Sequence, residues 1–224
     1  MKRIKPHTPV QYVMGHVQFC DLDLLVDERV LIPRPETEIL VDIASDIIKG
    51  AGIPASKARI LDLGTGSGNI AIALTKKIPD CKIIASDISG GALEVAKLNA
   101  GRNGVSDRIE FIKSDLFASL DGKFDIIVSN PPYISRPEFE SLQKEVLMEP
   151  HVALDGGSDG LDFYRKIISE AAKRLTSGGY IIFEIGFAQK KLICRIIEKE
   201  SVLKVMRVEI DHNEIERIVA ARKT

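Results

Sequence analysis

The sequence predicts an α/β fold with a doubly wound, mostly parallel sheet of seven strands. Three observations carry this prediction. From residue 59 onward, short apolar runs alternate with segments of helical periodicity, as expected for strands and helices that take turns along a parallel sheet. The first of these strands runs into a glycine-rich turn, and the fourth ends in the segment Asn130-Pro131-Pro132-Tyr133. In such sheets, ligands bind beyond the carboxyl ends of the strands.

The expected strands are short and apolar, which suits strands that helices cover on both faces. They lie at 59–63, 81–86, 108–113, 124–129, 180–185, 202–210 and 216–221. The segment Asp211-His212-Asn213 between the last two is typical of a hairpin turn. We therefore expect the last strand to be antiparallel to its neighbours.

Five helices are expected, because apolar residues recur there at helical spacing. They lie at 36–49, 68–77, 90–101, 160–175 and 189–199. Pro35 precedes the first helix, where proline is tolerated, and Gly50 ends it. Residues 9–32 hold shorter β-like stretches, which predict one or two hairpins. The chain thus divides into an amino-terminal β-hairpin segment, residues 1–35, and a main domain, residues 36–224.

Composition indicates a soluble globular protein of nearly neutral charge. The 224 residues are 45% hydrophobic and 28% charged, and the formal net charge is −1. No overall basic field therefore predicts nucleic-acid binding. The three cysteines and four histidines show no spacing typical of a disulfide framework or a metal site. No apolar run resembles a signal peptide or a membrane span, so we expect a cytoplasmic protein that binds neither metal nor membrane.

The segment Asn130-Pro131-Pro132-Tyr133 is the most informative part of the chain. Each proline fixes its own φ, and Pro131 favours an extended Asn130. An amide, two rigid prolines and an aromatic ring make a poor core, but they form a stiff loop that can hold a planar amide or amino group. We expect catalytic roles for Asn130, Pro131 and Tyr133, and substrate contacts from all four residues.

The turn Gly64-Thr65-Gly66-Ser67-Gly68 predicts a nucleotide-type site. Glycines permit positive φ and close approach of a ligand to the backbone, and the helix that begins near Gly68 offers free N–H groups. Asp87 ends the next strand, nineteen residues after Gly68. A carboxylate there can accept hydrogen bonds from both hydroxyls of a ribose, although it can also cap the following helix.

Two cofactor classes fit the glycines. The spacing Gly66-x-Gly68-x-x-Ala71 satisfies the dinucleotide pattern, whereas no P-loop pattern occurs in the sequence. A nicotinamide cofactor therefore stays open, and ATP hydrolysis is disfavoured. A further acidic residue, Asp115, follows the third strand. Its carboxylate can accept the amino group of adenine, while Leu116 or Phe117 covers the ring.

Together, the glycine turn, Asp87, Asp115 and the Asn130 segment resemble the class I S-adenosylmethionine-dependent methyltransferases. Within these, the chain resembles the HemK/PrmC family, the protein-(glutamine-N5) methyltransferases of bacterial peptide-chain release factors. The matching stretches are 9–15, 30–38, 62–68, 129–133, 149–161 and 184–186. The likeness spans roughly residues 9–222, and the stretch Pro33-Arg34-Pro35-Glu36-Thr37-Glu38 is its most family-specific part.

The resemblance implies a Rossmann-like domain that binds S-adenosylmethionine through the glycine turn, Asp87, Asp115, Leu116 and Asn130. It also implies that the methyl group goes to the amide N5 of a glutamine in the Gly-Gly-Gln loop of a release factor. The side-chain oxygen of Asn130 and the carbonyl of Pro131 would each accept one N–H bond from that amide, and Arg34 and Glu36 would line the substrate site.

Relatives in this family usually carry, before the Pro9 segment, a helical domain that helps to engage the release factor. We expect no counterpart in this sequence, so that either a longer chain or a different contact supplies this engagement. Three other functions remain open: a methyltransferase for amino groups of nucleic acids, which would flip a base into the same loop; a nicotinamide-linked dehydrogenase; and a non-catalytic adaptor.

Overall fold

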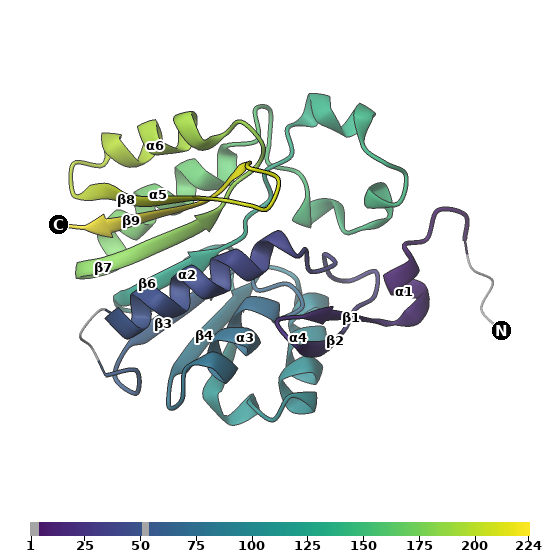
Figure 1. Cartoon of the computed structure of the whole chain (residues 1–224), viewed down its shortest axis with the longest axis horizontal. Coiled ribbons are helices and arrows are strands. Elements are labelled where there is room, and N and C mark those ends of the chain that lie inside the picture. Colours follow the sequence, from purple (N-terminus) through teal and green to yellow (C-terminus); the bar gives the residue numbers. More distant parts are fainter. Residues whose placement is uncertain (1–4, 51–53) are drawn as a thin grey trace.

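The structure, a computed structural model, is built around a central sheet of seven strands (Figure 1). It describes residues 5–50 and 54–224. The strands are β3 (Arg59–Leu63), β4 (Lys82–Asp87), β5 (Ile109–Lys113), β6 (Phe124–Ser129), β7 (Leu175–Glu184), β8 (Leu203–Ile210) and β9 (Glu216–Lys223). Their order is β5-β4-β3-β6-β7-β9-β8, and the five strands from β3 to β7 are mutually parallel. The predicted fold class is confirmed.

The predicted antiparallel direction of the last strand is also confirmed, and the structure adds its place in the sheet. β9 lies between β7 and β8 and is antiparallel to both. β7 starts five residues earlier than expected, because Leu175 pairs with Phe124 before the register shifts. This early part contains Gly178 and Gly179, which give no strand signal in the sequence.

Helices cover both faces of the sheet, and their bounds lie within two residues of the predicted ones. They are α2 (Glu36–Gly50), α3 (Asn69–Lys77), α4 (Gly90–Arg102), α5 (Asp162–Arg174) and α6 (Lys190–Lys199). α2 and α3 bury their apolar residues on one face, and α5 and α6 on the other (Figure 1). Because strand residues alternate between faces, Ile60 joins the first core, and its neighbour Leu61 joins the second.

The amino-terminal segment packs onto the main domain. It forms α1 (Val10–Met14) and a hairpin of β1 (His16–Phe19) and β2 (Leu22–Leu25). The hairpin turns at Cys20 and Asp21, which both have positive φ, as a type I′ hairpin turn requires. Residues 10–14 are helical rather than β, since Gly15 in the left-handed region closes a single helical turn. The division of the chain at residue 36 stays a prediction.

A long connection between β6 and α5 lies near the carboxyl ends of the strands. It contains the 3-10 turns η2 (Arg136–Ser141), η3 (Val146–Met148) and η4 (His151–Ala153), while η1 (Ser106–Arg108) precedes β5. Ile134 forms a bridge with Asp155. A Cβ atom on Gly156 would lie 2.8 Å from the backbone of Tyr133, so this close approach requires glycine. The connection is thereby tied to the segment that follows β6.

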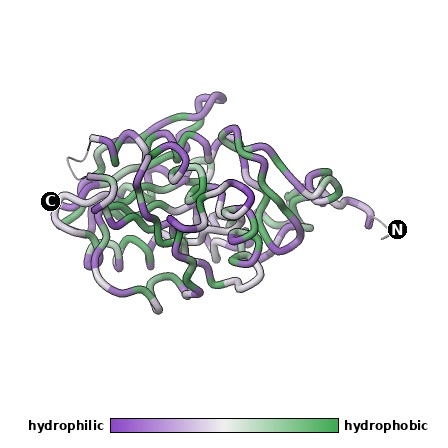
Figure 2. The backbone as a smooth tube through the Cα atoms, turned by 90° about the horizontal axis from the view of Figure 1, so that it is seen from below, coloured by the Kyte–Doolittle hydropathy of each residue, from purple (hydrophilic) through white to green (hydrophobic). Residues whose placement is uncertain are grey.

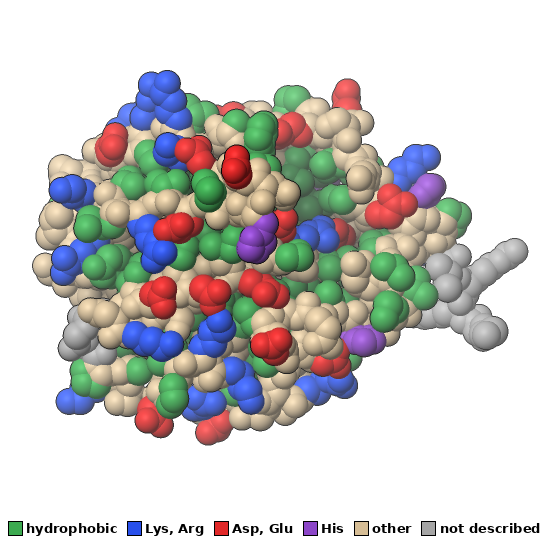
Figure 3. All heavy atoms as spheres, viewed as in Figure 1, with side chains coloured by type: hydrophobic (Ala, Val, Ile, Leu, Met, Phe, Trp, Pro, Cys, Tyr) green, Lys and Arg blue, Asp and Glu red, His purple; other side chains and the backbone are tan. Residues whose placement is uncertain are grey.

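Apolar stretches run through the middle of the molecule, and hydrophilic stretches lie on its outside (Figure 2). On the face that α2 covers, acidic and basic side chains are interspersed (Figure 3). In the parts of the chain that the structure describes, no helix combines the length and the apolar composition needed to cross a membrane.

Candidate active site

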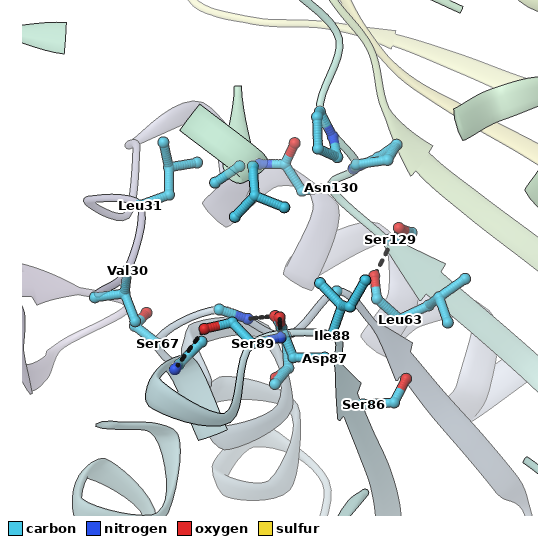
Figure 4. Close-up of a pocket in the computed structure, with 18 of the residues that line it drawn as sticks. Val30, Leu31, Leu63, Ser67, Ser86, Asp87, Ile88, Ser89, Ser129 and Asn130 are labelled. Atoms are coloured by element: carbon cyan, nitrogen blue, oxygen red, sulfur yellow. Dashed lines mark hydrogen bonds between the residues drawn. The ribbon is translucent and has the colours of Figure 1, made fainter. Parts of the chain in front are cut away.

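A cleft lies beyond the carboxyl ends of β3, β4, β5 and β6 (Figure 4), at the edge where parallel sheets bind ligands. Its lining comes from residues within 29–37, 63–70, 86–92, 114–116, 129–132, 150–153 and 163–167. The structure brings most of the predicted site residues into this lining: Arg34, Gly64, Thr65, Gly66, Ser67, Asp87, Asp115, Leu116, Asn130, Pro131 and Pro132. Gly68, Glu36 and Tyr133 lie outside it.

The glycine turn approaches the cleft with its backbone. Gly64, Gly66 and Gly68 all have positive φ. The N–H groups of Gly64 and Thr65 both donate to the carbonyl of Ser86, at 2.8 and 2.9 Å, which fixes the turn against the end of β4. A Cβ atom on Gly66 would meet no protein atom within 4 Å, whereas one on Gly68 would lie 3.1 Å from the Cβ of Ala96. Gly68 thus permits helix packing, and Gly66 leaves open space for a ligand.

The side chain of Asp62 fixes the glycine turn through hydrogen bonds. Its Oδ2 accepts hydrogen bonds from the Thr65 hydroxyl at 2.6 Å and from the N–H of Ala71 at 3.1 Å. The side chain is fully buried, and its Oδ1 has no hydrogen-bond partner among the residues described. Burial raises the pKa of this carboxyl to about 7. Sequence analysis did not assign Asp62 a role, because its position in a buried strand gives no sign of its partners.

Asp87 faces the cleft with both oxygens held by the main chain (Figure 4). Oδ2 accepts the N–H of Gly66 and Oδ1 that of Ser89, each at 2.9 Å. The cap of α4 is Ser89, whose side chain accepts the N–H of Ala92, so Asp87 is free for another role. Burial raises the pKa of Asp87. A carboxylate oxygen has room for more than one hydrogen bond, so both oxygens can also accept from a ligand.

Asp115, Leu116 and Phe163 also line the cleft. Leu116 has positive φ and belongs to the lining, whereas Phe117 is buried in the core. Phe163 is only half-buried and lines the cleft. It occupies the first turn of α5, where helical periodicity does not distinguish a core face from a cleft wall.

Asn130 and the prolines close the cleft opposite Asp87 (Figure 4). The hydroxyl of Ser129 donates to the carbonyl of Leu63 at 2.7 Å, which joins the ends of β6 and β3. The side chain of Asn130 donates through Nδ2 to the hydroxyl of Thr37 at 3.2 Å. Tyr133 packs beside the cleft, with its ring against Gly186.

Arg34 stands at the cleft and is held by an acid that sequence analysis missed. Glu149 is buried, and its carboxylate accepts hydrogen bonds from the Arg34 guanidinium and, at 2.9 Å, from the N–H of Ile32. The two residues are 115 positions apart in the sequence, so only the fold reveals the pair. Charge pairing of a buried carboxylate with a guanidinium restricts the arginine to one position.

Comparisons with known proteins identify the family. The family model described as Methyltransferase small domain matches residues 38–158. A release factor glutamine methyltransferase of Gloeobacter violaceus is 42% identical over 97% of this chain and 76% of its own length. Another of the same name, from Agrobacterium fabrum, is 48% identical over 81% of this chain and 63% of its own length. Across seven such relatives, the matched part spans 61–76% of the relative.

Solved structures agree with this fold. A ribosomal protein L11 methylase of Lactobacillus delbrueckii has a TM-score of 0.63 at 24% identity, over 89% of this chain and 84% of its own. A methyltransferase of Pyrococcus furiosus has a TM-score of 0.65 at 21% identity, over 90% of this chain and 89% of its own. With the cleft in place and relatives at up to 48% identity, this chain belongs to the release factor glutamine methyltransferase family.

Proposed function

We propose that this protein transfers a methyl group from S-adenosylmethionine to the side-chain amide nitrogen of a glutamine in a peptide-chain release factor. The observation that carries the proposal is the placement of Asn130 and Pro131 in the same cleft as the glycine turn and Asp87. Seven relatives at 40–48% identity bear the name release factor glutamine methyltransferase. This name supports the proposal over the nucleic-acid and nicotinamide alternatives. Because its substrate acts in translation, the proposal places the enzyme in the cytoplasm.

The cleft fits S-adenosylmethionine in three respects. Gly66 presents its backbone to open space, Asp87 has lone pairs left for ribose hydroxyls, and Leu116 and Phe163 offer apolar cover for a flat ring beside Asp115. When bound, the cofactor supplies an electrophilic methyl group on a positively charged sulfur.

The protein's own contribution is to position the acceptor amide. An amide nitrogen is a weak nucleophile, because its lone pair is delocalised into the carbonyl. Two acceptors, the Asn130 side-chain oxygen and the Pro131 carbonyl, fix both of its hydrogens and thereby direct the nitrogen toward the methyl group. Placement of this kind can lower a barrier by about 7–11 kcal/mol. Exclusion of water by the cleft walls keeps these hydrogen bonds from being exchanged for solvent.

The remaining predicted site residues, Arg34, Glu36 and Tyr133, would contact the substrate polypeptide on either side of the glutamine. Arg34, fixed by Glu149, lines the cleft and can donate to main-chain carbonyls of a bound loop. Glu36 and Tyr133 are not part of the lining, so their contact with the substrate stays a prediction. In this arrangement, Tyr133 supports the loop by packing on Gly186.

The decisive experiment is incubation of the enzyme with S-adenosylmethionine, labelled in its methyl group, and a purified release factor. Mass spectrometry of the Gly-Gly-Gln peptide should show one added methyl group on the glutamine. A release factor with this glutamine replaced by alanine serves as the matched control and should stay unlabelled. Label on another residue, or binding of the cofactor without any transfer, would overturn the proposal; the second result would favour the adaptor.

A further inference from the structure

The end of β7 lies beside the end of β6 and brings a buried acid toward the cleft. The register pairs Ser129 with Phe183, so the next residues, Asn130 and Glu184, leave neighbouring strands at the same edge. Ile182 faces the core under α2. Because strand residues alternate, Glu184 points to the same face, where α2 begins. Glu184 is 1% exposed, and the activity proposed above assigns it nothing.

Thr37, in the first turn of α2, connects this acid to the cleft. Its hydroxyl donates to the Glu184 carboxylate at 2.5 Å. The same hydroxyl oxygen accepts the Asn130 amide N–H at 3.2 Å. Thr37 is 1% exposed, so no bulk water competes for these bonds. The three side chains come from α2, from the end of β6 and from the end of β7, and they form one chain of hydrogen bonds that is buried at Glu184 and part-buried at Asn130.

The hydrogen-bond donors in this network of three side chains determine which way the Asn130 amide faces. An ionised carboxylate only accepts hydrogen bonds, and a hydroxyl has a single hydrogen. Since Thr37 donates this hydrogen to Glu184, its oxygen can only accept from Asn130. The NH2 group of Asn130 must therefore face Thr37, and the oxygen Oδ1 must turn away. Among the described residues, Oδ1 has no hydrogen-bond partner, and it is absent from the buried unpartnered atoms, so it remains open to a ligand.

We propose that Thr37 and Glu184 are positioning residues that orient the Asn130 carboxamide with its oxygen toward the methyl-accepting amide. This inference rests on the proposed function, because only an acceptor atom at this point can bind an N–H of the substrate. With the amide turned over, Asn130 would present its NH2 group to the substrate NH2 group, and its oxygen would face the Thr37 oxygen. Such a cleft would still bind the cofactor, but it would hold the glutamine wrongly.

When Glu184 is protonated, the orientation of the Asn130 carboxamide is no longer fixed. Burial raises the pKa of Glu184 to about 7, against the hydrogen bond from Thr37, the charge of Arg217 and a smaller contribution from the Asn130 side chain. The other titratable groups that act on it are Glu36 of α2, Tyr133 after β6 and Tyr164 of α5. A protonated Glu184 can donate to Thr37, whose hydrogen is then free to turn toward Asn130. We therefore expect turnover to rise with pH through about 7, because the ionised acid holds the productive orientation.

The test compares Thr37→Val, which removes the hydroxyl at nearly constant shape, with Thr37→Ser, which keeps it. Thr75→Val is the matched control, because Thr75 is equally buried and donates only within α3, to the carbonyl of Ala71. We expect Thr37→Val to lower kcat at least tenfold while the Kd for S-adenosylmethionine, measured by calorimetry, changes less than threefold. Thr37→Ser should restore most of the turnover, and Thr75→Val should match the wild type.

The pH profile of kcat distinguishes positioning by Thr37 and Glu184 from a merely structural role, because a structural role would leave the profile unchanged. The wild-type profile should have a limb that rises through about pH 7, and this limb should vanish in Thr37→Val and in Glu184→Gln. If Thr37→Val does not fold, the pH profile of Glu184→Gln tests the inference in its place. Normal turnover in Thr37→Val, equal losses in the valine and serine variants, or a limb that persists in Glu184→Gln would each overturn the inference.

Nuclear magnetic resonance separates this inference from the proposed function. The side-chain NH2 signals of Asn130, identified by their loss in Asn130→Ala, should exchange slowly with water in the wild type and rapidly in Thr37→Val. If the wild type fails to methylate a release factor but these signals behave as expected, the orientation stands and the proposed substrate falls. Rapid exchange in the wild type would overturn the orientation itself.

Discussion

Asp87 and Gly66 are joined by a 2.9 Å hydrogen bond from the glycine N–H to the carboxylate oxygen Oδ2. The carboxylate at the end of β4 therefore shapes the turn after β3 as well as facing the cleft. The same residue pair links the two parts of the predicted cofactor site, which are 21 positions apart in the sequence. A change at Asp87 should act on both.

Replacement of Asp87 by alanine should weaken binding of S-adenosylmethionine. Loss of hydrogen bonds to a charged group costs about 1.5–3 kcal/mol, or roughly 10- to 150-fold in Kd. Isothermal titration calorimetry measures this effect directly. Asp46→Ala, which changes an exposed acid of α2, is the control and should bind as the wild type does. An unchanged Kd in Asp87→Ala would show that Asp87 has only a structural role.

Replacement of Asn130 by alanine should separate binding from turnover. Cofactor affinity should stay within about threefold, because the glycine turn and Asp87 are untouched, while misplacement of the acceptor amide can cost roughly 10²-fold in rate. Calorimetry and a methyl-transfer assay give the two quantities. Asn213→Ala, in the exposed turn between β8 and β9, is the matched control. Turnover close to normal in Asn130→Ala would remove Asn130 from the mechanism.

Stability should fall as the pH rises from about 5 to 7. Burial raises the pKa of Asp62 and of Glu184 to about 7, above the values of carboxyls in an unfolded chain. In this window the folded state holds more protons than the unfolded state, so the free energy of unfolding decreases with pH, by up to about 1.4 kcal/mol per pH unit for each group. Above pH 8 the dependence should level off.

Urea unfolding at pH 5, 6, 7 and 8 tests this expectation. Asp62→Asn carries no titrating carboxyl at this position, so its free energy of unfolding should depend less on pH than that of the wild type. The exposed variant Asp46→Ala should keep the wild-type slope. A wild-type free energy of unfolding that rises between pH 5 and 7 would contradict the prediction.

Replacement of Asn99 by alanine should loosen the hairpin from the glycine turn. The buried side chain of Asn99 binds the N–H and carbonyl of Leu25 in β2 and the carbonyl of Ser67 in the turn. Each buried group left unsatisfied costs about 1–3 kcal/mol. Urea unfolding should therefore show a marked loss of stability. Asn103→Ala, which removes one bond near the end of α4, should lose much less; equal losses in both variants would refute this link.

Much of the fold follows from local pattern. The alternation of apolar runs and helical segments predicts the seven strands and five main helices, since periodicity depends only on which faces must be buried. The exceptions are places where local pattern misleads: Val10–Met14, where Gly15 closes a helical turn in a β-like stretch, and the early part of β7, where glycines pair with a neighbouring strand.

For the site, the sequence by itself determined which residues stand at the ends of strands: the glycine turn, Asp87, Asp115 and Asn130. Parallel strands bring their carboxyl ends to one edge, so these residues had to meet. Only the tertiary structure decided how they are held. The bonds of Thr37 to Glu184 and of Arg34 to Glu149 join residues more than 100 positions apart, and such partners depend on the packing of α2 and the long connection after β6, which no local periodicity encodes.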